Sequence, residues 1–385
     1  MKILMLSIDK GLLGKGQLGD VVERHERYGK SADRLDIIVF CKKGFSENRI
    51  SDNVSAWPTN SKNKCWYFFD GFKVGRALFS KNNYDLIVTQ EPFVTGLVGY
   101  MLKRKFGAKL LVHFHGDFFS PKWLAESPRN KLFLILGKFL ARRADAIRSV
   151  SSGIKESLVK KVGIKETKIR VISTPVSLER FEEVDEKIVL DFKTNFLKGH
   201  PTILHVGRED PAKDFETLTK TFALVLEKKP EVRLLQLGRL NQNIKFSEIK
   251  EKLKLFDSTK EPLAGPKLAI TDLPIIYSAV DLLVSSSTHE SFGKVLVEAN
   301  AAGRPVVATA TTGAKDIVKD GYNGFLVPIG DAEALAQKIL YLLDNPEEAK
   351  KIGENGRKLV WKNFSGQANT QKIINFWQDI SAGKL

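Results

Sequence analysis

The sequence of 385 residues has little cysteine and no long apolar run. Its two cysteines, Cys41 and Cys65, cannot build a disulfide framework and lack the spacing of a metal site, which predicts a reducing, cytoplasmic location. No stretch approaches the roughly 18 consecutive apolar residues that a membrane-spanning helix needs. The apolar run at residues 2–8 is short and no small-residue cleavage site follows it. We therefore expect a first buried strand there rather than a signal peptide.

The sequence also lacks the acidic patterns that hold a metal ion. It contains no Asp-x-Asp triplet, so a metal that bridges a nucleotide diphosphate has no evident ligands. The stretch "LVHFHGD" offers His113, His115 and Asp117 as the one close set of ligand types. We expect instead that His113 is a core residue within a strand and that His115, beside Gly116, projects from the strand end. No metal and no cofactor are therefore expected.

Positive charge is abundant, but only in the first half of the chain. Residues 1–180 hold 33 Lys and Arg against 17 Asp and Glu, whereas residues 181–385 hold 28 of each. The first half therefore carries the whole net charge of +16. Such an asymmetry fits an anionic surface or partner, and it equally fits a lysine-rich composition that only keeps the fold soluble. No nucleic-acid-binding module is visible, so we expect no nucleic-acid partner.

Buried strands alternate with amphipathic helices along the chain, which predicts two α/β domains with parallel sheets. A polar segment at residues 176–200 interrupts this alternation and is the expected linker. A length of 385 residues also favours two domains. Because doubly wound sheets bind ligands at the carboxyl ends of their strands, we expect the main site in a cleft between the domains. The expected strands lie at 2–8, 35–40, 84–90, 108–114, 145–151, 169–174, 202–207, 232–238, 281–287 and 305–310.

Two cations follow the first expected strand of the second half. In "HVGREDPAKDFETL" the strand ends at Gly207, and a helix is expected from about Phe215. Arg208 and Lys213 lie between them, near the positive end of that helix, where a guanidinium and an ammonium suit a diphosphate. Both can also be solvated loop residues.

Two glutamates surround a Phe-Gly turn in "HESFGKVLVEA". Glu290 precedes the expected helix and Glu298 lies one to two turns within it, while Gly293 permits close approach of a ligand to the backbone. Carboxylates accept hydrogen bonds from sugar and ribose hydroxyls. The alternative is a capping or solvent-facing glutamate, but a carboxylate after a buried strand is costly without a partner.

A glycine-rich stretch, "DKGLLGKGQLGD", follows the first expected strand of the chain. It fits the spacing G-x-G-x-x-G, but the second strand ends in basic residues where a dinucleotide-binding domain has an acidic one. We expect a loop in which Gly16 lets a phosphate approach, without ribose recognition.

Taken together, "GREDPAK", "LPIIYSAVDLLVSSSTHESFGKVLVEANAAGRPVVAT" and "IVKDGYNGFLVP" resemble the retaining glycosyltransferases of family four, with their E-x7-E signature. The resemblance implies the GT-B fold, with two Rossmann-like domains facing across a cleft. The acceptor-binding domain would comprise residues 1–176 and about 367–385, and the domain for a nucleotide-sugar donor residues 177–366. The sequence departs from the family at Thr174-Pro175-Val176 and at Gly313-Ala314-Lys315-Asp316.

The resemblance also implies a role for each motif residue. Arg208 and Lys213 correspond to the pair that holds the donor diphosphate, and Glu290 to the glutamate that contacts the transferred sugar. Glu298 corresponds to the glutamate on the ribose hydroxyls, and the amides of Phe292, Gly293 and Lys294 to part of the phosphate and sugar cradle. His115 is similar to the active-site histidine of the first domain, and Gly16 to a glycine near the diphosphate.

The expected activity is metal-independent, retaining, front-face transfer from a UDP- or GDP-sugar to a hydroxyl of a glycan, glycolipid or lipid-linked acceptor. Two alternatives remain open, a sugar-nucleotide epimerase of similar architecture and a non-catalytic nucleotide-sugar binding protein. The basic, aromatic stretches at 61–83 and 99–107 suit the anionic inner face of the cell membrane, unless Trp66, Phe68 and Phe69 are core residues.

Overall fold

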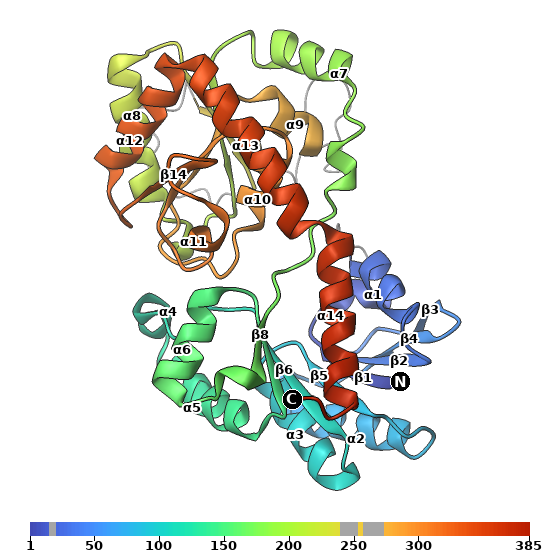
Figure 1. Cartoon of the computed structure of the whole chain (residues 1–385). Coiled ribbons are helices and arrows are strands. Elements are labelled where there is room, and N and C mark those ends of the chain that lie inside the picture. Colours follow the sequence, from blue (N-terminus) through green and yellow to red (C-terminus); the bar gives the residue numbers. More distant parts are fainter. Residues whose placement is uncertain (15–20, 239–252, 257–272) are drawn as a thin grey trace. The chain divides into compact units, whose positions relative to one another are not determined.

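The computed structural model describes residues 1–14, 21–238, 253–256 and 273–385. The chain forms two compact units (Figure 1). Unit 1 comprises Met1–Ser173 and Gln367–Leu385, and unit 2 comprises Thr174–Gly366. Within the described ranges no helix has both the length and the apolar character required to cross a membrane.

Unit 1 is built on one eight-stranded sheet. Its strand order is β3-β4-β2-β1-β5-β6-β7-β8, and all neighbours are parallel except the β3–β4 pair. The strands are β1 (Lys2–Ser7), β2 (Arg34–Val39), β3 (Asn48–Ser51), β4 (Val54–Pro58), β5 (Leu86–Thr89), β6 (Lys109–Phe114), β7 (Ala146–Ser149) and β8 (Ile169–Val171). The helices are α1 (Val21–Gly29), α2 (Tyr67–Phe79), α3 (Val94–Phe106), α4 (Pro121–Glu126), α5 (Pro128–Arg143), α6 (Ser152–Val162) and α14 (Gly366–Ser381).

Unit 2 contains a six-stranded parallel sheet in the order β11-β10-β9-β12-β13-β14. Numbered from the first strand of the unit, this order is 3-2-1-4-5-6, that of the Rossmann fold. The strands are β9 (Thr202–Val206), β10 (Arg233–Leu237), β11 (Leu253–Phe256), β12 (Leu282–Ser285), β13 (Val306–Thr309) and β14 (Gly324–Val327). The helices are α7 (Glu186–Asp191), α8 (Phe215–Lys228), α9 (Leu273–Ala279), α10 (Lys294–Ala301), α11 (Ala314–Ile317), α12 (Ala332–Asp344) and α13 (Pro346–Phe364).

The central strands of both sheets are apolar on both faces, as a sheet covered by helices on both sides requires. In β1 the side chains of Ile3 to Leu6 are fully buried, and in β12 Leu282 to Val284 are at most 1% exposed. All ten expected strand regions contain a strand. Four further strands, β3, β4, β11 and β14, are not predicted by the sequence pattern; they are four or five residues long and lie at or near sheet edges.

The prediction of a linker at residues 176–200 is wrong. This segment contains a 3-10 turn, η4 (Glu179–Phe181), then α7 and a π-helical turn at Phe192–Phe196. Phe181 and Phe192 are buried, and the whole segment belongs to unit 2. Its charged residues lie on the outer faces of short helices, a pattern that a polar composition alone does not distinguish from a loop.

The last helix, α14, belongs to unit 1 although α13 before it belongs to unit 2. Ile373, Phe376 and Trp377 of α14 are buried in one hydrophobic cluster with residues of β1 and α1. Figure 1 shows α14 beside these elements. Unit 1 is therefore completed by a segment distant in sequence.

Candidate functional site

The order of the strands brings the two main motifs of unit 2 together. β9 and β12 are hydrogen-bonded neighbours, with Ile203 beside Leu282 and Leu204 beside Leu283. They are strands 1 and 4 of the Rossmann order, so the crossover direction reverses between them. The loop after β9 carries Arg208 and Lys213, and the loop after β12 carries Glu290. Both loops leave the carboxyl edge of the sheet at this reversal, which is where such folds bind ligands.

Lys213 ends a short turn that is fixed from both sides. The turn, η6 (Pro211–Lys213), is capped by Asp210, whose side chain accepts a hydrogen bond from the Ala212 amide at 3.0 Å. The loop after β12 holds it from the other side, because Thr288 N donates to Ala212 O at 2.8 Å and Ser286 Oγ donates to Lys213 O at 2.7 Å. The backbone beneath Lys213 is therefore positioned before any ligand binds.

Lys213 and Glu290 form an ion pair. Lys213 Nζ lies 2.5 Å from Glu290 Oε2, and the two side chains are 21% and 26% exposed. In this state each charge neutralises the other. Phosphate oxygens could replace the carboxylate at the ammonium, and sugar hydroxyls could bind the carboxylate that is released.

The turn after Glu290 places backbone amides at the start of α10. Gly293 caps this helix with φ +89°, a conformation that favours glycine. Phe292 is buried, and Gly313 approaches it so closely that a Cβ on Gly313 would lie 2.5 Å from Phe292 N. Gly313 N donates to Glu290 O at 2.8 Å. The first turn of α10, with Lys294 exposed, offers N–H groups that have no partner within the helix.

Glu298 is buried in α10, so the alternative of a solvent-facing glutamate is wrong. Its side chain is 5% exposed and makes three polar contacts. Arg180 Nη2 lies 3.0 Å from Oε1, Tyr277 Oη donates to Oε2 at 3.0 Å, and Lys294 Nζ lies 3.6 Å from Oε1. Burial, and to a smaller extent the charge of Glu298, raises the pKa of Tyr277 well above its ordinary value. Tyr277 thus remains a hydrogen-bond donor to Glu298.

Arg208 differs from Lys213 because its side chain is exposed. It makes no hydrogen bond or ion pair with any residue in the described ranges. Arg208 follows β9 directly after Gly207, whose carbonyl accepts a hydrogen bond from Gln236 Nε2 at 2.8 Å. The arginine is therefore anchored at its backbone and has a guanidinium available for a ligand.

In unit 1, His115 follows β6 and meets the end of the neighbouring strand β5. His115 Nε2 lies 3.0 Å from Gln90 Oε1, and the side chain of His115 is partly buried. His113 is 1% exposed, which confirms that it is a core residue. Burial and the charge of Arg148 lower the pKa of His115 to about 3, so the imidazole is neutral near pH 7.

Gly16 lies outside the described residues. Among the residues that are described, no group of three or more His, Cys, Asp and Glu side chains could hold a metal ion.

Three polar residues at these sites were not expected from the sequence. Gln90 ends an expected strand whose neighbour carries His115, so strand order would have pointed to it. Arg180 belongs to the segment interpreted as a linker, and Tyr277 lies in the helix before β12. Only the tertiary fold shows that both contact Glu298.

Family models and known proteins resemble the chain over most of its length. A model described as "Glycosyltransferase Family 4" matches residues 27–180, and one described as "Glycosyl transferases group 1" matches residues 186–359. The capsular polysaccharide biosynthesis glycosyltransferase CapM of Staphylococcus aureus is 32% identical over 63% of this chain and 64% of that protein.

Solved structures share the fold of the whole chain. Sucrose-phosphate synthase from Thermosynechococcus elongatus has a TM-score of 0.82 at 22% identity and covers 100% of both chains. Anabaena Alr3699/HepE in complex with UDP-glucose has a TM-score of 0.75 at 21% identity, and covers 98% of this chain and 100% of that one. With a Rossmann-like sheet in each unit and a glycosyltransferase family matched in each half, the chain belongs to the family-four glycosyltransferases of the GT-B fold.

Proposed function

We propose that the protein is a retaining glycosyltransferase of polysaccharide biosynthesis. It transfers a sugar from a UDP- or GDP-sugar to a hydroxyl of a glycan, glycolipid or lipid-linked acceptor. The observation that carries this proposal is the meeting of Lys213 and Glu290 at the carboxyl edge of β9 and β12. A group that binds phosphate and a group that binds hydroxyls are adjacent there, as a nucleotide-diphosphate sugar requires.

The cations would act on the leaving group. When the anomeric bond breaks, negative charge develops on the diphosphate, and Arg208, Lys213 and the amides at the start of α10 would offset it. Removing one such preorganised contact costs on the order of 3 kcal/mol in the transition state. Donor binding would also open the Lys213–Glu290 ion pair, because the diphosphate competes for the ammonium.

The hydroxyl-binding groups would orient the two ends of the donor. Glu290 would accept hydrogen bonds from the transferred sugar, and Glu298, held by Arg180 and Tyr277, would face the ribose. Neutral His115 would contribute from unit 1 as a hydrogen-bonding group rather than as a cation. Retention would follow from attack of the acceptor hydroxyl on the leaving-group face, with a departing phosphate oxygen accepting its proton.

The acceptor assignment is supported by the relatives and by the surface of unit 1. CapM acts in capsular polysaccharide biosynthesis according to its name. In α5, Leu132 and Ile135 are 68% and 66% exposed, three residues apart on one helix face. Lys131 and Arg142 of the same helix are also exposed. Trp66, which directly precedes α2, and Phe69 within α2 are 50% and 61% exposed, so they are not core residues. Apolar side chains among cations suit an anionic membrane surface, which an enzyme with a lipid-linked acceptor must approach at its inner face.

The decisive experiment is turnover with a panel of UDP- and GDP-sugars and an acceptor extract. Anabaena HepE has been solved with UDP-glucose, which makes UDP-glucose the first donor to test. Proton NMR of the product reports the anomeric configuration, and we expect the axial configuration of the donor to be retained. An inverted product would refute the retaining mechanism. Absence of turnover with every donor, together with tight donor binding, would favour the non-catalytic alternative.

Two controls separate the remaining possibilities. Because the cations of the site can carry the charge of the leaving group, we expect activity to persist in EDTA; a requirement for added Mg²⁺ or Mn²⁺ would refute metal independence. Release of free UDP with a changed sugar in the absence of any acceptor would favour an epimerase.

A further inference from the structure

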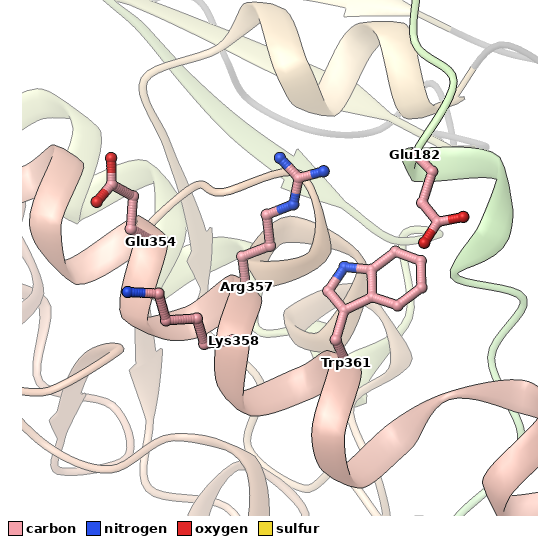
Figure 2. A pocket seen from close by; sticks show the side chains of 5 residues that line it. All are labelled: Glu182, Glu354, Arg357, Lys358 and Trp361. Atoms are coloured by element: carbon pink, nitrogen blue, oxygen red, sulfur yellow. The ribbon is translucent and has the colours of Figure 1, made fainter.

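A pocket lies on unit 2, along one face of α13. It has a volume of about 380 Å³ and is lined by Glu182, Glu354, Arg357, Lys358 and Trp361. Figure 2 shows these side chains, four from α13 and Glu182 from the segment that follows η4. The volume falls near the lower end of the range of about 300–1,000 Å³ for small-molecule sites.

The pocket has two firmly anchored walls. Residues 354, 357, 358 and 361 are spaced so that they share one face of α13. A different face of this helix packs closely, because a Cβ on Gly356 would lie 2.6 Å from the Asn300 side chain and one on Gly353 would lie 2.0 Å from Gly303 O. The other wall follows Phe181, which is buried and contacts Tyr277 with ring centroids 6.0 Å apart. The backbone on both sides of the pocket is therefore held in place by packing.

The pocket is lined by equal numbers of positive and negative side chains, which form no ion pairs with one another. The lining comprises two carboxylates, Glu182 and Glu354, and two cations, Arg357 and Lys358. None of these four side chains forms a hydrogen bond or an ion pair with another residue of the described ranges, and all four are exposed. Because two carboxylates and two cations leave the lining without net charge, the pocket offers a phosphate no net charge attraction. A neutral hydroxyl group can donate to a carboxylate and accept from a guanidinium or ammonium.

Trp361 supplies the apolar part of the pocket. Its ring is partly buried, and its Nε1 is covered by protein, so the indole presents carbon atoms rather than its N–H group. A flat aromatic surface surrounded by both hydrogen-bond donors and acceptors matches the two characters of a sugar ring, whose C–H faces are apolar and whose edge is hydroxylated.

We propose that this pocket binds a neutral saccharide at a site separate from the donor site. That the saccharide is a glycosyl unit of the acceptor or product rests on the proposed function, whereas binding of a neutral sugar does not. Three successive residues connect the pocket to Glu298 of the proposed donor site. Glu182 lines it, Phe181 packs on Tyr277, and Arg180 pairs with Glu298. The pocket therefore adjoins the turn that carries Arg180, the partner of Glu298.

The test is saturation-transfer NMR on the whole protein with methyl glycosides of glucose, galactose, mannose and N-acetylglucosamine as probes. UDP is added to fill the donor site, and inorganic phosphate is a separate probe. We expect transfer to at least one glycoside in the presence of UDP, with affinity about tenfold weaker in Trp361→Ala. Arg357→Ala, at an exposed position, should weaken it as well and leaves the packing of α13 intact. Lys350→Ala on α13 and Trp66→Ala in unit 1 are matched controls that should bind as the wild type does.

Three outcomes would overturn the proposal. They are absence of transfer to every glycoside, transfer that Trp361→Ala and Arg357→Ala leave unchanged, and binding of phosphate alone. This binding assay does not depend on turnover. If the separate turnover assay found no transfer while a glycoside still bound here, the proposed function would be refuted but this site would not. If the enzyme were active but the saturation-transfer signals of the glycosides were the same in Trp361→Ala, Arg357→Ala and the wild type, only this site would be refuted.

Discussion

Lys213 and Glu290 are separated by 77 positions in sequence, and their charged atoms lie 2.5 Å apart at the carboxyl edge of the unit 2 sheet. The sequence predicted a separate role for each residue, one on the diphosphate and one on the sugar. Their pairing implies that these two charges neutralise each other before the donor arrives. At Lys213, binding of a diphosphate then requires an exchange of partners, whereas Arg208 is already unpaired among the described residues.

Lys213→Ala should lower kcat/KM for the donor by about 10²–10³-fold, because the leaving diphosphate loses a preorganised cation. Steady-state kinetics with the active donor measures the effect. Lys220→Ala on α8, an exposed lysine paired with Glu216, is the matched control and should keep wild-type activity. Equal activity of the two variants would contradict a role for Lys213 in catalysis.

Arg208→Ala should weaken UDP binding by about 10- to 100-fold, since hydrogen bonds to a charged group contribute about 1.5–3 kcal/mol. The melting temperature should not change, because the side chain is exposed and unpaired among the described residues. Isothermal titration with UDP and a thermal melt check both statements, with Lys228→Ala on α8 as the control. If Arg208→Ala bound UDP with wild-type affinity, a role for Arg208 in binding the diphosphate would be refuted.

Arg180→Ala should destabilise unit 2 by about 1–3 kcal/mol, because the buried carboxylate of Glu298 loses its closest cation. Water around Arg180, which is 37% exposed, keeps the loss below that of a fully buried pair. Urea denaturation measures it, and Glu179→Ala on the same turn is the control. In combination with Glu298→Gln the two effects should be less than additive; strict additivity would show that the residues do not interact.

Stability should fall as the pH drops from about 6.5 towards 3, and His115 should account for part of the fall. Its pKa in the folded protein is about 3, below the ordinary 6.5, so in this interval the unfolded chain binds a proton that the folded chain does not. The pKa of His205 is lowered to about 4, mainly by burial, so protonation of His205 also favours the unfolded chain in this interval. Urea midpoints at pH 7 and pH 5 should differ less in His115→Gln than in the wild type. His200→Gln, at a partly exposed histidine, is the control, and an unchanged difference in His115→Gln would contradict the shift.

The double variant Leu132→Ser/Ile135→Ser should reduce co-sedimentation with liposomes that contain anionic lipid. The two exposed side chains on α5 would otherwise enter the interface while neighbouring cations contact headgroups. Leu190→Ser on α7 of unit 2, 65% exposed, is the matched control. Wild-type sedimentation that is independent of anionic lipid and of salt would refute membrane association through this surface.

The architecture could be predicted because long buried strands, such as 2–8 and 202–207, are apolar on both faces and leave a clear pattern. The loops that follow β9 and β12 could be predicted for the same reason, since each motif comes directly after such a strand. The short strands β3 and β4 carry mixed side chains and no comparable pattern. They could be found only from their pairing with β2 and with each other.

The immediate contacts of the site could not be predicted from the sequence. Arg180 and Tyr277 lie 118 and 21 positions from Glu298, in an expected linker and in a helix, and neither has a local pattern that reveals its partner. Glu290 and Lys213 were each expected near a ligand. That they neutralise each other depends on the β9–β12 pairing, which periodicity does not specify.

The position of α14 has a consequence for biosynthesis. Trp377 is buried in the same cluster as Ile3 and Met5, so the core around β1 is completed only after α14, which follows all of unit 2 in sequence, has been translated. Unit 2, a continuous segment, has all its residues available earlier. On the ribosome the second unit can therefore fold before the core of the first unit is complete.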